Sequence, residues 1–188
     1  MNFFLKFILI LFFITNKVHA QNKWVIEKEL SIITFEIPVL LTKDVNGKFN
    51  KFDGYVVIDL ENEKNNKAIF SVEINSLEIN YDKYIDLLFS DVFFDQINYP
   101  IAIIDTKKFS NPKELNSLKI EAELQIKNIS NKIPIEIEIK HLANNWVQIL
   151  ANMKFSRNSF ELGKGVWSSK IILNDTVNLK ANLFLSKE

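Results

Sequence analysis

Apolar and polar residues alternate along most of the chain after residue 21. Isoleucine occupies every odd position of residues 133–139, while Pro or Glu fills the positions between them. The same period of two runs through residues 118–126 and 177–183, and in weaker form through residues 70–74 and 147–155. Successive side chains of a strand point to opposite faces, so this pattern is typical of strands that bury one face.

Short polar connections separate these segments. Asn46-Gly47 and Asp53-Gly54 indicate turns or bulges, and residues 128–131 and 144–145 have the length of hairpin connections. Many strands joined by tight connections indicate an antiparallel meander. A long meander leaves unpaired edges unless it closes on itself. We therefore expect an all-β fold, an extended antiparallel barrel of about eight strands.

Residues 82–100 depart from this rhythm. Their apolar positions recur at steps of three and four, which predicts a short helix; these positions are Tyr84, Ile85, Leu87, Leu88, Val92 and Phe93. Pro100 restricts the residue before it and ends the segment. A short apolar helix suits the open end of a barrel. We expect it to cap one mouth, with Leu88, Phe93 and Phe94 as anchors and Asp95 holding its end.

Residues 1–20 have the pattern of a cleavable signal peptide. Lys6 is followed by an apolar run over residues 7–14, and Val18 and Ala20 are placed as in a cleavage site. The apolar run is shorter than the roughly 20 residues that a membrane-spanning helix needs. We therefore expect a mature domain of residues 21–188 that is periplasmic or secreted and has no stable membrane anchor.

Composition removes several classes of function. The chain has no Cys, so it forms no disulfide and has no thiol nucleophile. Its 23 Lys and Arg residues balance 23 Asp and Glu residues, and the two signs are interleaved. Because there is no basic stripe, nucleic acid is not an expected partner. His141 is the single His after residue 20, which is too little for a metal site or a catalytic triad.

Three other polar residues are candidates for chemistry. Asp91 and Asp95 lie four residues apart and would share one face of the expected helix, where a carboxylate pair could act on a lipid by acid–base catalysis. In the alternative they keep the outer side of the helix in water or cap turns. Arg157 is the only Arg in the chain, and its planar fork suits a carboxylate or phosphate head group. In the alternative, Arg157 is an exposed charge at the end of a strand and contacts no ligand.

The apolar face of the expected strands is the strongest functional clue. An eight-stranded barrel has an interior that side chains fill or that holds one small ligand. Mid-sized aliphatic side chains dominate this face and leave both outcomes open: a tunnel for an apolar chain, or a filled structural or stress module without a ligand. For a tunnel, we expect the wall to include Phe35, Leu118, Ile120, Leu124, Ile126, Ile135, Ile137, Leu179 and Leu183.

Several motifs, in order, resemble those of the YceI-like family. Residues 24–26 and 30–35 have the spacing of the family's first strand, and Gly47, Phe49, Phe52 and Gly54 match its G-x-F-x-x-F-x-G motif. Residues 157–160 are similar to its Arg-x-Asp-Phe motif. The most specific match is L-x-S-x-x-F-F-D-x-x-x-Y-P, formed here by Leu88, Ser90, Phe93, Phe94, Asp95, Tyr99 and Pro100.

This resemblance implies a lipocalin-like barrel that binds long isoprenoid chains, as polyprenyl lipids or quinones, often in the periplasm and without a general enzymatic step. No other cofactor is implied, and a homodimer is compatible with it. The chain departs from the family where Arg, Asp and His usually precede the Phe pair, because residues 84–89 are largely apolar. Leu30 replaces a His, and Ala122 and Asn128 replace Gly. The resemblance therefore implies an isoprenoid- or fatty-acid-like chain rather than a particular head group.

Overall fold

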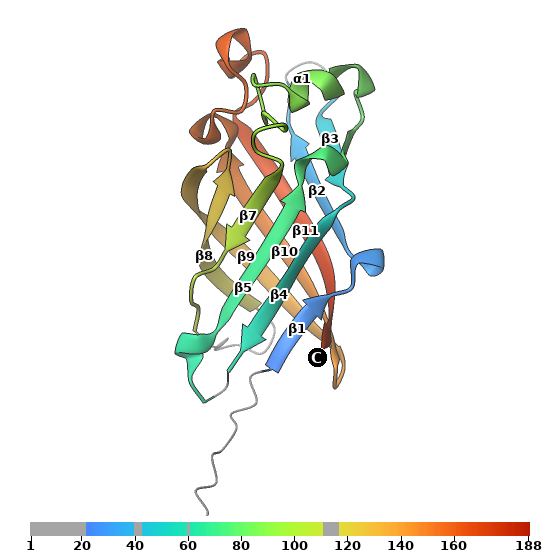
Figure 1. Ribbon diagram of the computed structural model, residues 1–188, viewed down its shortest axis with the longest axis vertical. Helices are drawn as coiled ribbons and strands as arrows, with labels where there is room; N and C mark the ends of the chain where they lie inside the picture. Colours follow the sequence, from blue (N-terminus) through green and yellow to red (C-terminus); the bar gives the residue numbers. More distant parts are fainter. Residues whose placement is uncertain (1–21, 40–42, 60, 111–116) are drawn as a thin grey trace, which may run out of the picture.

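The computed structural model describes residues 22–39, 43–59, 61–110 and 117–188, which form one antiparallel sheet of eleven strands (Figure 1). The sheet order is β1-β4-β5-β7-β8-β9-β10-β11-β2-β3-β6, and β1 also pairs with β11. The strands are β1 (Asn22–Ile26), β2 (Ile32–Ile37), β3 (Val45–Phe49), β4 (Phe52–Ile58), β5 (Lys67–Glu73), β6 (Leu77–Ile79), β7 (Ile101–Asp105), β8 (Ser117–Ile126), β9 (Ile129–Ala143), β10 (Trp146–Ser156) and β11 (Thr176–Lys187).

Three long strands are each interrupted once, which reconciles eleven strands with an eight-stranded barrel. The 3₁₀ turn η1 (Lys28–Leu30) separates β1 from β2, and both pair with β11. Residues 50–51 separate β3 from β4, and η3 (Ile74–Ser76) separates β5 from β6. Followed through these interruptions, the chain runs up and down eight times, and β11 closes the ring against β1. The prediction of an all-β, closed antiparallel barrel is confirmed.

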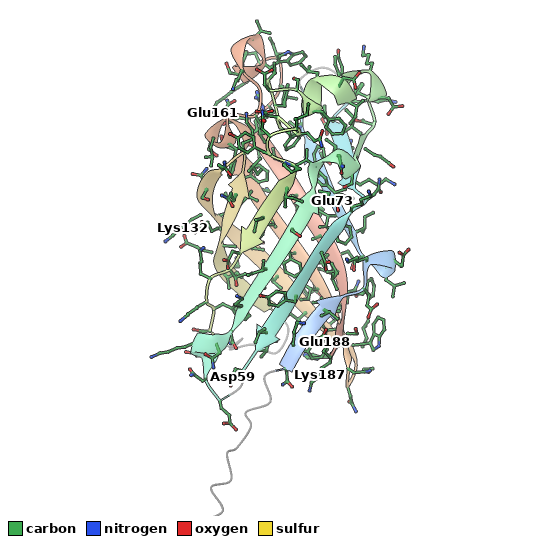
Figure 2. The ribbon with its side chains drawn as sticks, in the orientation of Figure 1. Asp59, Glu73, Lys132, Glu161, Lys187 and Glu188 are labelled. Atoms are coloured by element: carbon green, nitrogen blue, oxygen red, sulfur yellow. The ribbon has the colours of Figure 1, made fainter. Side chains whose placement is uncertain are left out.

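The period-two pattern sets which side chains enter the barrel. In the β8–β9 ladder Ile120 lies opposite Ile135, and in the β10–β11 ladder Met153 lies opposite Leu179. These positions face inward, whereas neighbouring residues such as Glu121, Glu136 and Lys180 are polar and exposed; Figure 2 shows Lys132 at the periphery. Directly paired residues of neighbouring strands share a face, so the alternation of each strand reinforces that of the next.

One end of the barrel carries helix α1 and three of the 3₁₀ turns. The turn η4 (Asp82–Tyr84) leads into helix α1 (Ile85–Phe89), and η5 (Arg157–Phe160) and η6 (Gly165–Ser168) lie at the same end (Figure 1). The opposite end holds η2 (Glu63–Asn65), the β9–β10 hairpin and the C-terminus. The predicted cap is therefore confirmed, and we call this the capped end.

The helix of the cap is shorter than the sequence predicted. Ser90 is extended, its N–H donates to the carbonyls of Asp86 and Leu87, and its hydroxyl donates to Leu87. Ser side chains compete in this way with helical hydrogen bonds, and the helix ends at Phe89. Phe93 and Phe94 follow in a turn, so they are not on the helix. Among the described residues, no helix is long and apolar enough to cross a membrane.

Candidate functional site

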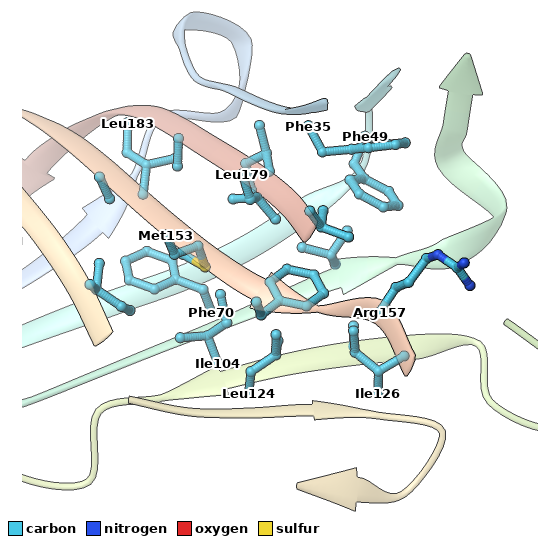
Figure 3. Close-up of a pocket in the computed structure, with 18 of the residues that line it drawn as sticks. Phe35, Phe49, Phe70, Ile104, Leu124, Ile126, Met153, Arg157, Leu179 and Leu183 are labelled. Atoms are coloured by element: carbon cyan, nitrogen blue, oxygen red, sulfur yellow. The ribbon is translucent and has the colours of Figure 1, made fainter. Parts of the chain in front are cut away.

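The barrel encloses a cavity of about 870 Å³. Small-molecule sites are commonly about 300–1,000 Å³ and largely apolar, so this volume is large enough for a ligand. Figure 3 shows side chains from several strands converging on it, among them Phe70, Leu124, Met153 and Leu183. The interior is therefore not filled by its own side chains.

The cavity is long as well as large. On β10 every second residue from Val147 to Phe155 contributes to the wall. At about 3.3 Å per residue, these positions extend over roughly 26 Å of strand. The wall also reaches η4 and α1 at the capped end and His141 near the opposite end. An elongated, apolar tunnel of this kind suits an extended hydrocarbon chain better than a compact ligand.

All nine residues that we expected in the wall of a tunnel do line the cavity. Leu124, Ile126 and Ile135 are nearly inaccessible to solvent, whereas Leu118 and Ile120 are half-buried towards the opposite end. Aromatic side chains contribute more of the wall than the sequence analysis indicated. The period-two pattern includes Phe70 and Phe155. It gives no sign of the lining aromatic residues that lie outside regular alternation, among them Trp24, Phe49, Phe109 and Trp167.

Aromatic rings line the capped end of the cavity. Leu88, Phe93 and Phe94 line the cavity there, as expected of a lid. Trp167, which the sequence analysis did not single out, packs against Phe93 with ring centroids 6.1 Å apart and against Tyr84 at 6.0 Å. Its signal in the sequence was weak, because the residues around it have no regular period. The lid is thus built from two chain segments, residues 84–94 and the loop that contains Trp167.

Asp95 stabilises the turn after the lid rather than the end of a helix. It has a left-handed backbone with φ of 49°, its carbonyl accepts the N–H groups of Asn98 and Tyr99, and its Oδ1 accepts Asn98 Nδ2 at 2.9 Å. Asp91 is exposed, and neither carboxylate lines the cavity. Because the helix ends before them, the two residues do not share a helix face. The shared helix face that their spacing suggested is therefore not formed, and neither carboxylate is placed to act on a chain inside the cavity.

Arg157 is a structural residue of the capped end. It is almost fully buried, and all five N–H groups of its guanidinium donate within the protein: Nε to Asn174 O, Nη1 to Leu162 O and Asn158 Oδ1, and Nη2 to Ser169 O and Leu173 O. Burial lowers the pKa of Arg157, and the charge of Asp175 opposes this. No donor remains for a ligand, which corrects the expectation of a head-group contact. Through these hydrogen bonds Arg157, the only Arg of the chain, stabilises the loop between β10 and β11.

Few ionisable side chains line the cavity. Apart from Arg157 and the phenols of Tyr81 and Tyr84, those in the described part of the chain are Lys43 and Lys83 at the capped end and His141 near the other end. The described residues contain no group of three or more acidic or His side chains that could hold a metal ion. The site can therefore enclose an apolar chain, with charge available only at its ends.

Comparisons with known proteins agree with this geometry. The family model of the YceI-like domain matches residues 24–185. A protein named BcnA, from Burkholderia cenocepacia, superposes with a TM-score of 0.76 at 19% identity, over 85% of this chain and 98% of that one. A polyisoprenoid binding domain from Saccharophagus degradans gives 0.71 at 13% identity, over 88% and 98%.

The YCEI protein of Campylobacter jejuni gives a TM-score of 0.68 at 22% identity, over 80% of this chain and 89% of that one. No curated protein matches the sequence. At these identities the solved structures establish the fold, while the family model covers most of the chain. The protein belongs to the YceI-like family.

Proposed function

We propose that the protein binds a long apolar chain, isoprenoid- or fatty-acid-like, inside its barrel and carries it without changing it chemically. The observation that supports this most directly is the continuous apolar cavity of about 870 Å³ that extends along the barrel. A barrel that served only as a scaffold would gain stability by filling this space, because cavities inside a core are destabilising.

Desolvation supplies the binding energy. Each CH₂ group that leaves water contributes about 0.8 kcal/mol, so a chain of ten or more buried carbons needs few polar contacts to bind tightly. The wall offers little discrimination between chains of similar width, since it is apolar on all sides. Specificity would then come from chain length and from the groups at the two ends of the cavity. The polyisoprenoid binding domain of Saccharophagus degradans has this fold, which makes an isoprenoid our first choice.

Mass spectrometry of an organic extract of the protein, purified from its native host without detergent, tests this proposal. We expect one predominant species with a long hydrocarbon chain. In parallel, delipidated protein should bind geranylgeraniol and palmitate with one chain per barrel, as measured by titration calorimetry. If the extract is empty and neither probe binds, the barrel is a ligand-free module. Chemical conversion of a bound probe would instead support an enzyme.

Two further expectations remain predictions. Residues 1–20 lie outside the described residues. We expect their removal to leave the mature chain in the periplasm or outside the cell. An intact mass of the protein from its host that matches a start at Gln21 would support this. A homodimer is checked by light scattering of the delipidated protein during size-exclusion chromatography.

A further inference from the structure

Exposed apolar side chains gather on the loop between η5 and β11. Val166, Ile171 and Ile172 are 70%, 80% and 48% exposed. We call residues 165–172 the tip; it projects from the capped end beside α1 (Figure 1). Single exposed apolar residues are common on protein surfaces, but three within seven positions of one loop form an apolar patch of the kind that marks an interaction site.

The tip is continuous with the mouth of the cavity. Ile172 and Trp167, both within the tip, line the cavity wall. Trp167 also packs edge-on against Tyr84, which is itself part of the wall and partly exposed. Apolar side chains of the tip therefore lie both on the outside of the protein and in the wall of the tunnel. A partner that covered the tip would lie directly against the entrance.

Unpaired lysines surround this surface. Lys43 and Lys83 line the mouth, and Lys164 directly precedes the tip. None of the three forms an ion pair within the described part of the chain, whereas Lys170 is paired with Asp175 at 2.9 Å. Lys83 Nζ lies 4.9 Å from the ring centroid of Tyr84, next to the exposed apolar surface.

Acidic residues are also present at the capped end, among them the exposed Asp91 and Glu161, but no acidic side chain of the described residues lines the cavity, whereas Lys43 and Lys83 do. Asp44 Oδ1 accepts the N–H of Val39, and the Asp175 carboxylate accepts Ser156 Oγ and the N–H of Asn158. Asp82 and Asp86 do not line the mouth, although their neighbours Lys83 and Leu87 do. The mouth thus presents apolar side chains with positive charge at their border. That combination complements the head groups and acyl region of a bilayer that contains anionic lipids.

We propose that the capped end docks on an anionic lipid bilayer, with Val166 and Ile171 inserted at the level of the head groups and Lys43, Lys83 and Lys164 over anionic phosphates. This rests on the proposed function and extends it, because a water-insoluble chain is stored in a membrane and must enter the tunnel from there. Docking places the mouth against the acyl region, so the chain passes from bilayer to tunnel without crossing water. A second copy of the chain on the same surface would obstruct that entrance.

Co-sedimentation with vesicles tests the docking. The delipidated mature chain is mixed with vesicles of phosphatidylcholine alone, or of phosphatidylcholine with phosphatidylglycerol. Val166→Ser/Ile171→Ser should partition about tenfold less to the mixed vesicles, because two exposed apolar side chains are lost. The matched control is Leu30→Ser/Ile32→Ser, which removes exposed apolar residues from the side of the barrel and should partition like the wild type.

Charge variants separate the two contributions. Replacing Lys43, Lys83 and Lys164 by Gln should weaken partition to the mixed vesicles, by about fivefold for each lysine in contact, and leave partition to neutral vesicles unchanged. All these side chains are exposed, so the variants should melt like the wild type. The docking proposal is overturned if the wild type does not partition, or if the control variant loses as much as the tip variant. It also fails if the tip variant instead abolishes a dimer.

A second measurement keeps docking and chain binding distinguishable. Geranylgeraniol added from ethanol should bind equally to the wild type and to the tip variant, because the tunnel is intact in both. Transfer of the same probe from mixed vesicles should be slower for the tip variant. Partition without binding of any chain would refute the proposed function but support docking; equal transfer rates for both proteins would refute docking as the route of entry.

Discussion

Phe70 lies directly opposite Gly54 in the β4–β5 ladder, and its ring occupies the space that a Cβ atom at position 54 would need. The same relationship joins Phe35 of β2 to Gly47 of β3. Both rings line the cavity. The two glycines let the rings lie against the barrel wall instead of projecting across the tunnel. This gives the two ends of the G-x-F-x-x-F-x-G motif a physical role, which is to keep the tunnel open.

Gly54→Ala should therefore narrow the tunnel. The new methyl group displaces the Phe70 ring into the lumen and also meets the carbonyl oxygen of Ile69 at 2.7 Å. Overpacking of this kind costs about 1–3 kcal/mol of stability. We expect a lower melting temperature and weaker binding of geranylgeraniol by calorimetry. In a Phe70→Leu background the same substitution should weaken binding less; an undiminished effect would mean that the ring is not responsible.

Trp167 should control how fast a bound chain leaves. Its contacts with Tyr84 and Phe93 close part of the mouth. Aromatic pairs are worth about 0.5–1.5 kcal/mol each, so losing two should speed dissociation roughly tenfold. Stopped-flow release of a fluorescent chain from Trp167→Ala measures this. Trp146→Ala is the control, because Trp146 is half-buried at the opposite end and does not line the cavity. Equal release rates would place the exit at that end.

The regular part of the fold could be predicted from the sequence because a strict period of two has few other structural solutions. Ile133 to Ile139 can bury all four isoleucines only as a strand, and the neighbouring strands repeat the pattern. The interruptions that divide the first three long strands into β1 to β6 could not be predicted from this pattern. They depend on local turns such as η1 and η3, whose residues also fit an uninterrupted strand.

The lid shows which features of the candidate site could not be predicted from the sequence. Steps of three and four continue from Tyr84 to Phe93, yet hydrogen bonds of Ser90 end the helix at Phe89. Side-chain competition of this kind is invisible to a pattern of apolar positions. Arg157 stands out in the sequence only as the single Arg of the chain, and its partners are carbonyl groups of a loop without periodicity. Sequence spacing cannot show that a loop folds back onto one guanidinium.

Arg157→Lys should destabilise the protein without acting on a ligand directly. An ammonium group has three donors and no planar fork, so carbonyls now paired with the guanidinium lose their partners. Each buried group left unpaired costs about 1–3 kcal/mol. We expect a clear loss of unfolding free energy in urea, against nearly none for the exposed Lys154→Gln. Unchanged stability with weakened binding of a phosphorylated chain would restore the head-group role.

Asp175 should make the capped end sensitive to acid. Although burial raises the pKa of its carboxyl group, hydrogen bonds from Lys170, the Asn158 N–H and Ser156 outweigh this and lower it. A folded-state pKa below the unfolded value of about 3.9 means that the charged form stabilises the protein above that pH. The contribution is lost as pH falls through the folded-state pKa.

Comparison with Asp175→Asn isolates this contribution from other carboxylates. At pH 7 the variant should be less stable by about 1–2 kcal/mol, because charge-assisted hydrogen bonds are weakened. As pH falls below about 4, the wild type should approach the variant, since its own carboxyl becomes neutral. Thermal melts between pH 7 and pH 3 measure the difference. A difference that stays constant over this range would show that the charge of Asp175 is not what stabilises the loop.

Leu124→Asp tests the inward face of the barrel most severely. Leu124 is 4% exposed, lines the cavity and lies in the C-terminal half of β8. Its replacement removes buried apolar area, which costs about 2–5 kcal/mol for Leu→Ala, and adds a carboxylate without a partner. We expect a large drop in melting temperature and loss of chain uptake even where the protein remains folded. Glu121→Gln, on the outer face of the same strand, is exposed and should leave both unchanged. Equal melts for the two variants would mean that β8 presents the opposite face to the tunnel.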